Sequence, residues 1–155
     1  MALPLDEDGV PGKASLDLRA PRELCRKAHQ VRVHPGGVFA YAQCLGDDTL
    51  QILRVDGDRV RWSGRIGMPP SSGPRHLGFH PSGERLFVLT EFTSTIFAYS
   101  IDTGSGNLTK VETISALPDG RTEGSRSSDI HVSRDGRFVY AVHREPLDEI
   151  VTLQL

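Results

Sequence analysis

The chain of 155 residues has little cysteine, no long apolar run and no excess of charge of either sign. Its net charge of −2 gives no electrostatic basis for binding nucleic acid or an anionic membrane. No apolar run reaches the length of a membrane span, so we expect no transmembrane helix. Residues 1–8 lack the basic and apolar regions of a signal peptide. These absences predict a cytoplasmic protein with no nucleic-acid or membrane partner.

The two cysteines, Cys25 and Cys44, are too few and too widely spaced for a disulfide framework or a zinc site. We therefore expect two reduced thiols. The six histidines are not spaced like metal ligands, so the sequence predicts no metal site and implies no cofactor.

What the sequence does contain is a spaced repeat. His34–Gly37 (HPGG) recurs 46 residues later as His80–Gly83 (HPSG), and again 53 residues further on as Ser133–Gly136 (SRDG). Each copy leads into a short apolar run typical of a strand. A period of about 40–50 residues built from short strands is typical of β-propeller blades.

Strand signals begin at residue 28 and fall into three sets. The predicted strands are 28–34, 38–43, 49–55 and 59–66; 74–80, 85–91, 95–101 and 108–116; and 128–133, 137–143 and 149–155. We predict an all-β fold, a partial β-propeller over residues 27–155 with two complete four-stranded blades and one incomplete blade. Residues 1–26, rich in Pro, Gly and charge, are predicted to form an irregular or mobile leader. An array cut in mid-blade exposes sheet edges, so we expect self-association through them.

The repeat also indicates where a site is expected. In each blade the first two strands form a hairpin, which places the start of the first strand beside the end of the second. Shifting by the repeat period gives two series of equivalent positions: His29, Arg75 and Ser128, and Leu45, Glu91 and Arg144. Because the first strand of a blade lines the central channel, these side chains are expected to converge at one mouth. Arginine matches carboxylate or phosphate geometrically, so the mouth suits a small anionic ligand.

Other roles remain open for several of these residues. Arg75 and Glu91 are equally suited to an ordinary structural ion pair. His76, next to Arg75, is a second candidate for contacting a ligand. Asp129 and His131 alternate along one strand, and we expect them either to form a hydrogen-bonded inner layer or to bind the substrate.

Several motifs occur together in one family's order and spacing. They are Gly73–Pro81, Thr90–Glu91, Leu117–Pro118, Ser128–Val132, Asp135–Tyr140 and Arg144. In this the chain resembles the seven-bladed lactonase family, which contains bacterial 6-phosphogluconolactonases and fungal carboxy-cis,cis-muconate cyclases. The resemblance spans roughly residues 28–155, less than half of a seven-bladed ring.

The resemblance implies a lactone hydrolase that converts a sugar lactone to a sugar acid in carbohydrate metabolism. It implies four catalytic residues: His29, Arg75, Glu91 and Arg144. The stretch Gly46–Asp48 is similar to the family's Gly-x-Asp, so Asp48 is expected to join His76, Asp129 and His131 in binding the substrate. Thr90 and His143 stand where the family often has Asn or Asp, a departure that bears on substrate choice.

Hydrolysis of a lactone needs a base and stabilisation of the developing oxyanion. Either Glu91 or His29 is expected to take the proton from water, while Arg75 and Arg144 bind the anionic group and the oxyanion. The sequence has no Gly-x-Ser-x-Gly motif, so we expect no acyl-enzyme. Two alternatives remain: a muconate lactone cyclase, and a truncated non-catalytic propeller fragment that acts as a binding or scaffold element.

Overall fold

The computed structural model describes residues 7–9, 25–57, 59–118, 121 and 126–155. The predicted leader, residues 1–26, lies almost entirely outside this part of the chain. The described residues form eleven β-strands and no helix. They therefore contain no helix long and apolar enough to cross a membrane.

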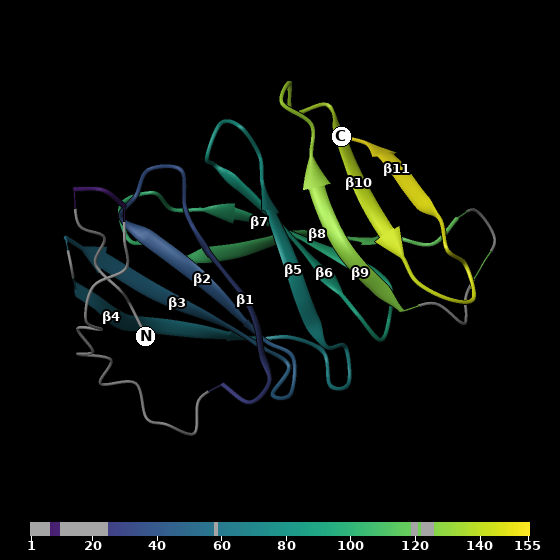
Figure 1. The fold of residues 1–155 in the computed structure, drawn as a ribbon, viewed down its shortest axis with the longest axis horizontal. Coiled ribbons are helices and arrows are strands. Elements are labelled where there is room, and N and C mark those ends of the chain that lie inside the picture. Colours follow the sequence, from purple (N-terminus) through teal and green to yellow (C-terminus); the bar gives the residue numbers. More distant parts are fainter. Residues whose placement is uncertain (1–6, 10–24, 58, 119–120, 122–125) are drawn as a thin grey trace.

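The strands form three antiparallel sheets that lie side by side (Figure 1). The first contains β1 (Ala28–Val33), β2 (Phe39–Cys44), β3 (Thr49–Asp56) and β4 (Arg59–Gly67). The second contains β5 (Pro74–Phe79), β6 (Arg85–Thr90), β7 (Thr95–Ile101) and β8 (Leu108–Ser115). The third contains β9 (Ser127–Val132), β10 (Phe138–His143) and β11 (Ile150–Gln154). The predicted partial propeller of two four-stranded blades and one three-stranded blade is confirmed.

The repeated turn explains why each blade begins with a hairpin. Gly37, Gly83 and Gly136 each donate their N–H to the carbonyl three residues earlier, with φ between +72° and +75°. This left-handed conformation is strained for any residue that carries a Cβ. The histidine that opens the first turn, His34, accepts the N–H of Gly36 on Nδ1 at 3.0 Å.

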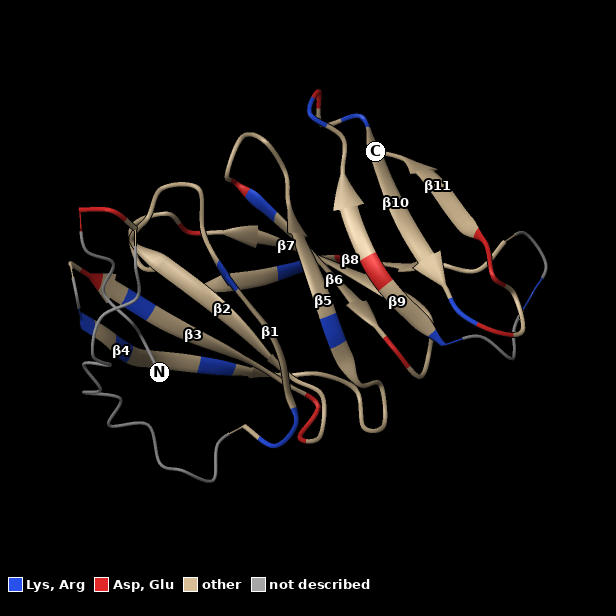
Figure 2. Ribbon diagram, viewed as in Figure 1, with Lys and Arg blue, Asp and Glu red and all other residues tan. Residues whose placement is uncertain are grey.

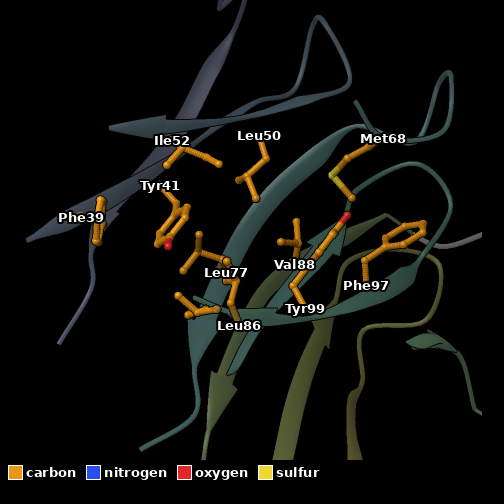
Figure 3. Packing of buried hydrophobic residues seen from close by; sticks show 11 residues of the cluster. Phe39, Tyr41, Leu50, Ile52, Met68, Leu77, Leu86, Val88, Phe97 and Tyr99 are labelled. Carbon is orange, nitrogen blue, oxygen red and sulfur yellow. The ribbon is translucent and has the colours of Figure 1, made fainter. Parts of the chain in front are cut away.

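The core lies between the blades. Side chains from the first two sheets, among them Tyr41, Leu50, Leu77 and Val88, face one another in a single cluster (Figure 3). A second cluster, which includes Ile130, joins the second and third sheets. Each fully buried aliphatic side chain of this size contributes about 1.5–3 kcal/mol through removal from water. Packing of apolar side chains between neighbouring blades therefore holds the three sheets together.

The three sheets do not close into a ring. The inner strands β1, β5 and β9 come from successive blades, and β5 contacts both of the others. Apolar side chains remain exposed on the two outermost blades: Val31 (60%) and Val33 (56%) on β1, and Ile150 (67%) on β11. In the described part of the chain, both ends of the array thus carry exposed apolar side chains.

The prediction of two reduced thiols is wrong. Cys25 and Cys44 form a disulfide, with their Cα atoms 4.9 Å apart. The two cysteines are 19 residues apart in sequence. They are close in space because β1 and β2 form an antiparallel hairpin, which places the end of β2 beside the segment before β1. The N–H of Leu45 donates to the carbonyl of Lys27 at 3.2 Å, directly beside the disulfide.

Candidate functional site

A β-bulge interrupts the inner strand of every blade at the same end, which we call the mouth. The pairing of β1 with β2 skips His29, that of β5 with β6 skips Arg75, and that of β9 with β10 skips Ser128. These are the three residues of the first series obtained from the repeat. A bulge re-aims the side chain of the unpaired residue, so one residue per blade is turned out of the regular ladder.

The second series follows directly after the second strand of each blade. Leu45, Glu91 and Arg144 each donate their N–H to a carbonyl just before the inner strand, at 3.2, 2.7 and 2.9 Å. This repeated closure places the residue after the second strand beside the bulge residue of the same blade. The structure therefore brings the two predicted series together at the mouth.

Glu91 lies at the centre of a charged cluster. Its Oε2 accepts from Arg75 Nε at 3.0 Å, and its Oε1 accepts from Arg144 Nη2 at 2.6 Å and lies 3.4 Å from Arg126 Nη1. The Glu91 side chain is 10% exposed, whereas those of Arg126 and Arg144 are 65% and 47% exposed. Arg75 also donates to the carbonyl of Ser128 in the next blade. The ion pair weighed for Arg75 and Glu91 is thus observed, and it lies at the mouth.

Arg126 was not among the predicted site residues. It occupies the position of Gly73 in the second blade, so the repeat did not mark it as a charged site position, although the hairpin pairing of the third blade places it next to Arg144. Three guanidinium groups around one carboxylate leave an excess of positive charge. Figure 2 shows charged residues of both signs at the lower ends of β5, β9 and β10, where the mouth lies.

The arginines determine the protonation of Glu91. Its partial burial alone would raise the pKa, but the hydrogen bond and charge of Arg144, followed by those of Arg75, hold the pKa of Glu91 below its usual value. Glu91 is therefore ionised near neutral pH, and a carboxylate with a lowered pKa is a weak base.

His29, in contrast to Glu91, is held in its uncharged form. Its ring is exposed and contacts the ring of His76 edge-on, with centroids 5.0 Å apart. Partial loss of hydration, followed by the positive charge of Arg75, lowers the pKa of His29 below 6.5. His29 is consequently neutral near pH 7, with a ring nitrogen able to accept a proton.

Behind His29, the inner strands carry a hydrogen-bonded layer. His76 Nδ1 lies 2.5 Å from Asp129 Oδ1, and His131 Nε2 lies 3.0 Å from Asp129 Oδ2. The burial of Asp129 opposes ionisation, but the hydrogen bonds from His76, the N–H of Ile130 and His131 together lower the pKa of Asp129. These residues thus form the inner layer that was one of the two expected arrangements. The described residues contain no group of three ligating side chains arranged for a metal ion.

Asp48 lies at the mouth end of the first blade. Its carboxylate accepts the N–H groups of Ser71 and Gly73 at 2.7 and 2.8 Å. These residues lead directly into β5, so Asp48 fixes the approach of the chain to Arg75. The backbone carbonyl of Asp48 also accepts the N–H of Met68 at 2.8 Å, directly after β4.

A groove of about 250 Å³ lies elsewhere, between the second and third sheets. Phe87, Ile96, Val139 and Leu153 are among its lining residues. None of the predicted site residues lines it. The charged groups among them converge at the mouth instead.

Comparison with known proteins agrees with this architecture. Residues 2–155 match the family described as "Lactonase, 7-bladed beta-propeller". The chain belongs to this lactonase family. The match begins earlier than the motif resemblance did, and it includes most of the segment predicted as a leader.

Individual relatives are all considerably longer. The 6-phosphogluconolactonase of Bacillus subtilis is 32% identical over 147 residues, which cover 91% of this chain and 42% of the relative. That of Pectobacterium carotovorum is 31% identical over 144 residues, with the same coverage. The chain thus spans less than half the length of these relatives.

Solved structures give the same result. A putative 6-phosphogluconolactonase from Bacteroides uniformis has a TM-score of 0.79 at 29% identity, and covers 99% of this chain and 46% of its own. A periplasmic gluconolactonase from Pseudomonas aeruginosa has a TM-score of 0.84 at 25% identity, with 99% and 45% covered. The three blades therefore superpose on part of a lactonase propeller.

Proposed function

We propose that the chain provides the catalytic mouth of a lactone hydrolase that acts on a phosphorylated sugar lactone, with 6-phosphogluconolactone as the first substrate to test. One observation carries the proposal: ionised Glu91 is held among three arginines beside the neutral His29. Relatives with the same blades are named 6-phosphogluconolactonases, which supports this substrate class.

In the proposed reaction, His29 is the general base. A ring nitrogen of His29 takes a proton from water as the water oxygen attacks the lactone carbonyl. The ring C–O bond then breaks, and the proton returns from His29 to the leaving alkoxide, which gives the hydroxy acid. Glu91 is a weaker candidate for the base because its pKa is lowered. Its role is to hold the arginines in place.

The three arginines have different proposed roles in binding. Arg75, 16% exposed and fixed by Glu91 and Ser128, is suited to stabilise the oxyanion. The more exposed Arg126 and Arg144 are suited to bind the phosphate.

The inner layer of His76, Asp129 and His131 offers hydrogen-bonding groups for sugar hydroxyls. Asp48 acts indirectly, through the loop before β5. A muconate-type diacid would engage the same arginines through two carboxylates, and a substrate panel separates this alternative.

The experiment is a hydrolysis assay on the whole 155-residue chain with 6-phosphogluconolactone, muconolactone-type diacids and unphosphorylated gluconolactone. We expect hydrolysis above the spontaneous rate, a decrease in kcat of about 10²–10⁴-fold in His29→Gln, and little change in His80→Gln. His80 is a matched control because it lies in a turn at the opposite end of its blade. A folded chain without activity would leave a binding or scaffold element as its function.

We also propose self-association through the open sheet edges. It is supported by the exposed valines of β1 and by Ile150 on the edge strand β11. Light scattering at several concentrations, with circular dichroism, is expected to give a β-rich dimer or trimer. A well-folded monomer at all concentrations contradicts this proposal.

A further inference from the structure

The chain segment just before each inner strand, which we call the mouth loop, determines where the bulge residue lies. In the second blade, Asp48 of the first blade holds this loop through the N–H groups of Ser71 and Gly73. At the start of the third blade, Ser127 donates its hydroxyl to Ser94 of the second blade at 3.0 Å. Each preceding blade thus anchors the next.

The first blade has no preceding blade among the described residues, and its mouth loop is held differently. Cys25 is joined to Cys44, which is fully buried at the end of β2. Arg26 Nε donates to Asp47 Oδ1 at 2.6 Å, and the N–H of Gly46 donates to the carbonyl of Arg26 at 2.9 Å. All these contacts lie within one blade.

The repeat gives independent support for this function of Cys44. Its equivalents are Thr90 and His143, both buried polar residues. Thr90 Oγ1 accepts the N–H of Thr95 at 3.0 Å, and His143 Nδ1 lies 3.2 Å from Ser127 Oγ. Thr90 thus bonds within the turn between β6 and β7, whereas His143 contacts the start of the inner strand β9. A contact from this position to the start of the inner strand therefore occurs in the third blade, and in the first blade the corresponding link is covalent.

We propose that the Cys25–Cys44 disulfide is a redox-sensitive clamp that positions His29, which rests on the proposed function of the mouth. His29 follows Cys25 by four residues and is unpaired at the bulge, so its place depends on the segments on either side. A dithiol reductant would break the S–S bond, with two electrons and two protons passing to the cysteines while the reductant closes its own disulfide. The Arg26–Asp47 ion pair, whose arginine is 75% exposed, and the backbone bond from Gly46 to Arg26 would then remain. An ion pair with an exposed partner contributes little.

The clamp also bears on the compartment. The prediction of two reduced thiols agreed with a cytoplasmic protein, and the disulfide removes that agreement. Disulfides persist in oxidising compartments and are rare in the reducing cytosol. The clamped form of the mouth is therefore the form expected outside the cytosol.

The test compares the oxidised chain, the same chain reduced with dithiothreitol, and the double variant Cys25→Ser/Cys44→Ser. Mass spectrometry after thiol alkylation is expected to find no free thiol before reduction and two after it. On reduction, we expect kcat for the lactone to fall about tenfold with KM changed less than threefold, because the base is misplaced rather than the binding groups. The double variant is expected to have the kcat of the reduced chain, and dithiothreitol is expected to leave that kcat unchanged.

A second measurement separates this proposal from the proposed function. NMR titration of the His29 ring reports its surroundings without any substrate, and on reduction its pKa is expected to rise toward 6.5. His143, in the third blade, serves as the internal control and is expected to titrate unchanged. Free thiols in the oxidised protein, or an unchanged His29 titration on reduction, would overturn the clamp. If the His29 pKa shifts on reduction but the chain hydrolyses no lactone, the clamp proposal stands and the proposed lactone hydrolase function is wrong.

Discussion

Arg144 Nη2 lies 2.6 Å from Glu91 Oε1, although the two residues are 53 positions apart and belong to neighbouring blades. This bond joins the equivalent positions of two blades, each directly after the second strand. The same carboxylate also holds Arg75 within its own blade. Glu91 therefore connects the second and third blades at the mouth as well as placing two arginines.

Glu91→Gln is expected to lower the free energy of unfolding at pH 7 by about 1.5–3 kcal/mol, because charged hydrogen bonds to two arginines are lost. The pKa of Glu91 is lowered in the folded state, so its stabilising effect is complete above about pH 4.5, the unfolded value, and is lost as the pH falls through the lower folded value. Denaturant unfolding of both proteins from pH 7 to pH 2 should therefore show the difference shrinking in acid. A constant difference across this range would contradict the role of the ionised carboxylate.

Arg75→Gln is expected to raise the pKa of His29, because the positive charge of Arg75 is one of the causes that lower it. The base form of His29 is present above its pKa, so the acid limb of the pH–rate profile should move to higher pH in the variant. NMR titration of the ring gives the same quantity directly. The pKa of His143, lowered by burial, should stay the same and serves as the control.

Alanine at the three turn glycines is expected to be tolerated in the order Gly37, Gly83, Gly136. A Cβ at Gly37 meets no atom within 4 Å, one at Gly83 lies 3.2 Å from His34 Nε2, and one at Gly136 overlaps His80 Nε2. All three share a positive φ, so Gly37→Ala measures the backbone cost alone, about 1–2 kcal/mol.

The excess in Gly136→Ala is then attributable to contact between blades. A double-mutant cycle with His80→Ala is expected to remove this excess and to leave the backbone cost. Thermal or denaturant unfolding of the variants provides the measurement. Equal destabilisation at all three glycines would show that the histidine rings play no part.

Gln43→Leu is expected to stabilise the protein by about 1–2 kcal/mol, because a buried amide without partners costs about 1–3 kcal/mol. Gln43 is fully buried, and neither of its amide atoms has a hydrogen-bond partner among the described residues. The equivalent positions hold apolar residues, Leu89 and Val142. Gln51→Leu is the matched control and should destabilise, since Gln51 is bonded to Thr49 and Trp62.

The strands were predictable because two signals agree in every blade. The repeated turn sets the start of the second strand, and apolar runs mark the strands themselves, so every predicted boundary lies within one residue of the observed one. The repeat period also predicted that four charged or titratable residues lie at the mouth, because a constant shift superposes one blade on the next. These residues are His29, Arg75, Glu91 and Arg144.

The sequence did not reveal contacts between residues that are not related by the repeat period. The Cys25–Cys44 disulfide depends on the spatial return of a hairpin. Arg126 replaces a glycine, and the carboxylate of Asp48 contacts the segment that leads into the following blade. Each of these depends on distances between segments, which residue spacing alone does not give.

The bulges give each blade one position whose side chain is detached from the strand ladder. A substitution there leaves the hydrogen-bond register and the packed core as they were. The three such positions already hold histidine, arginine and serine at equivalent bulges. New chemistry can therefore evolve, or be engineered, by exchanging single residues at these positions, while the strand pairing of each blade is kept and only the contacts of the exchanged side chain are lost.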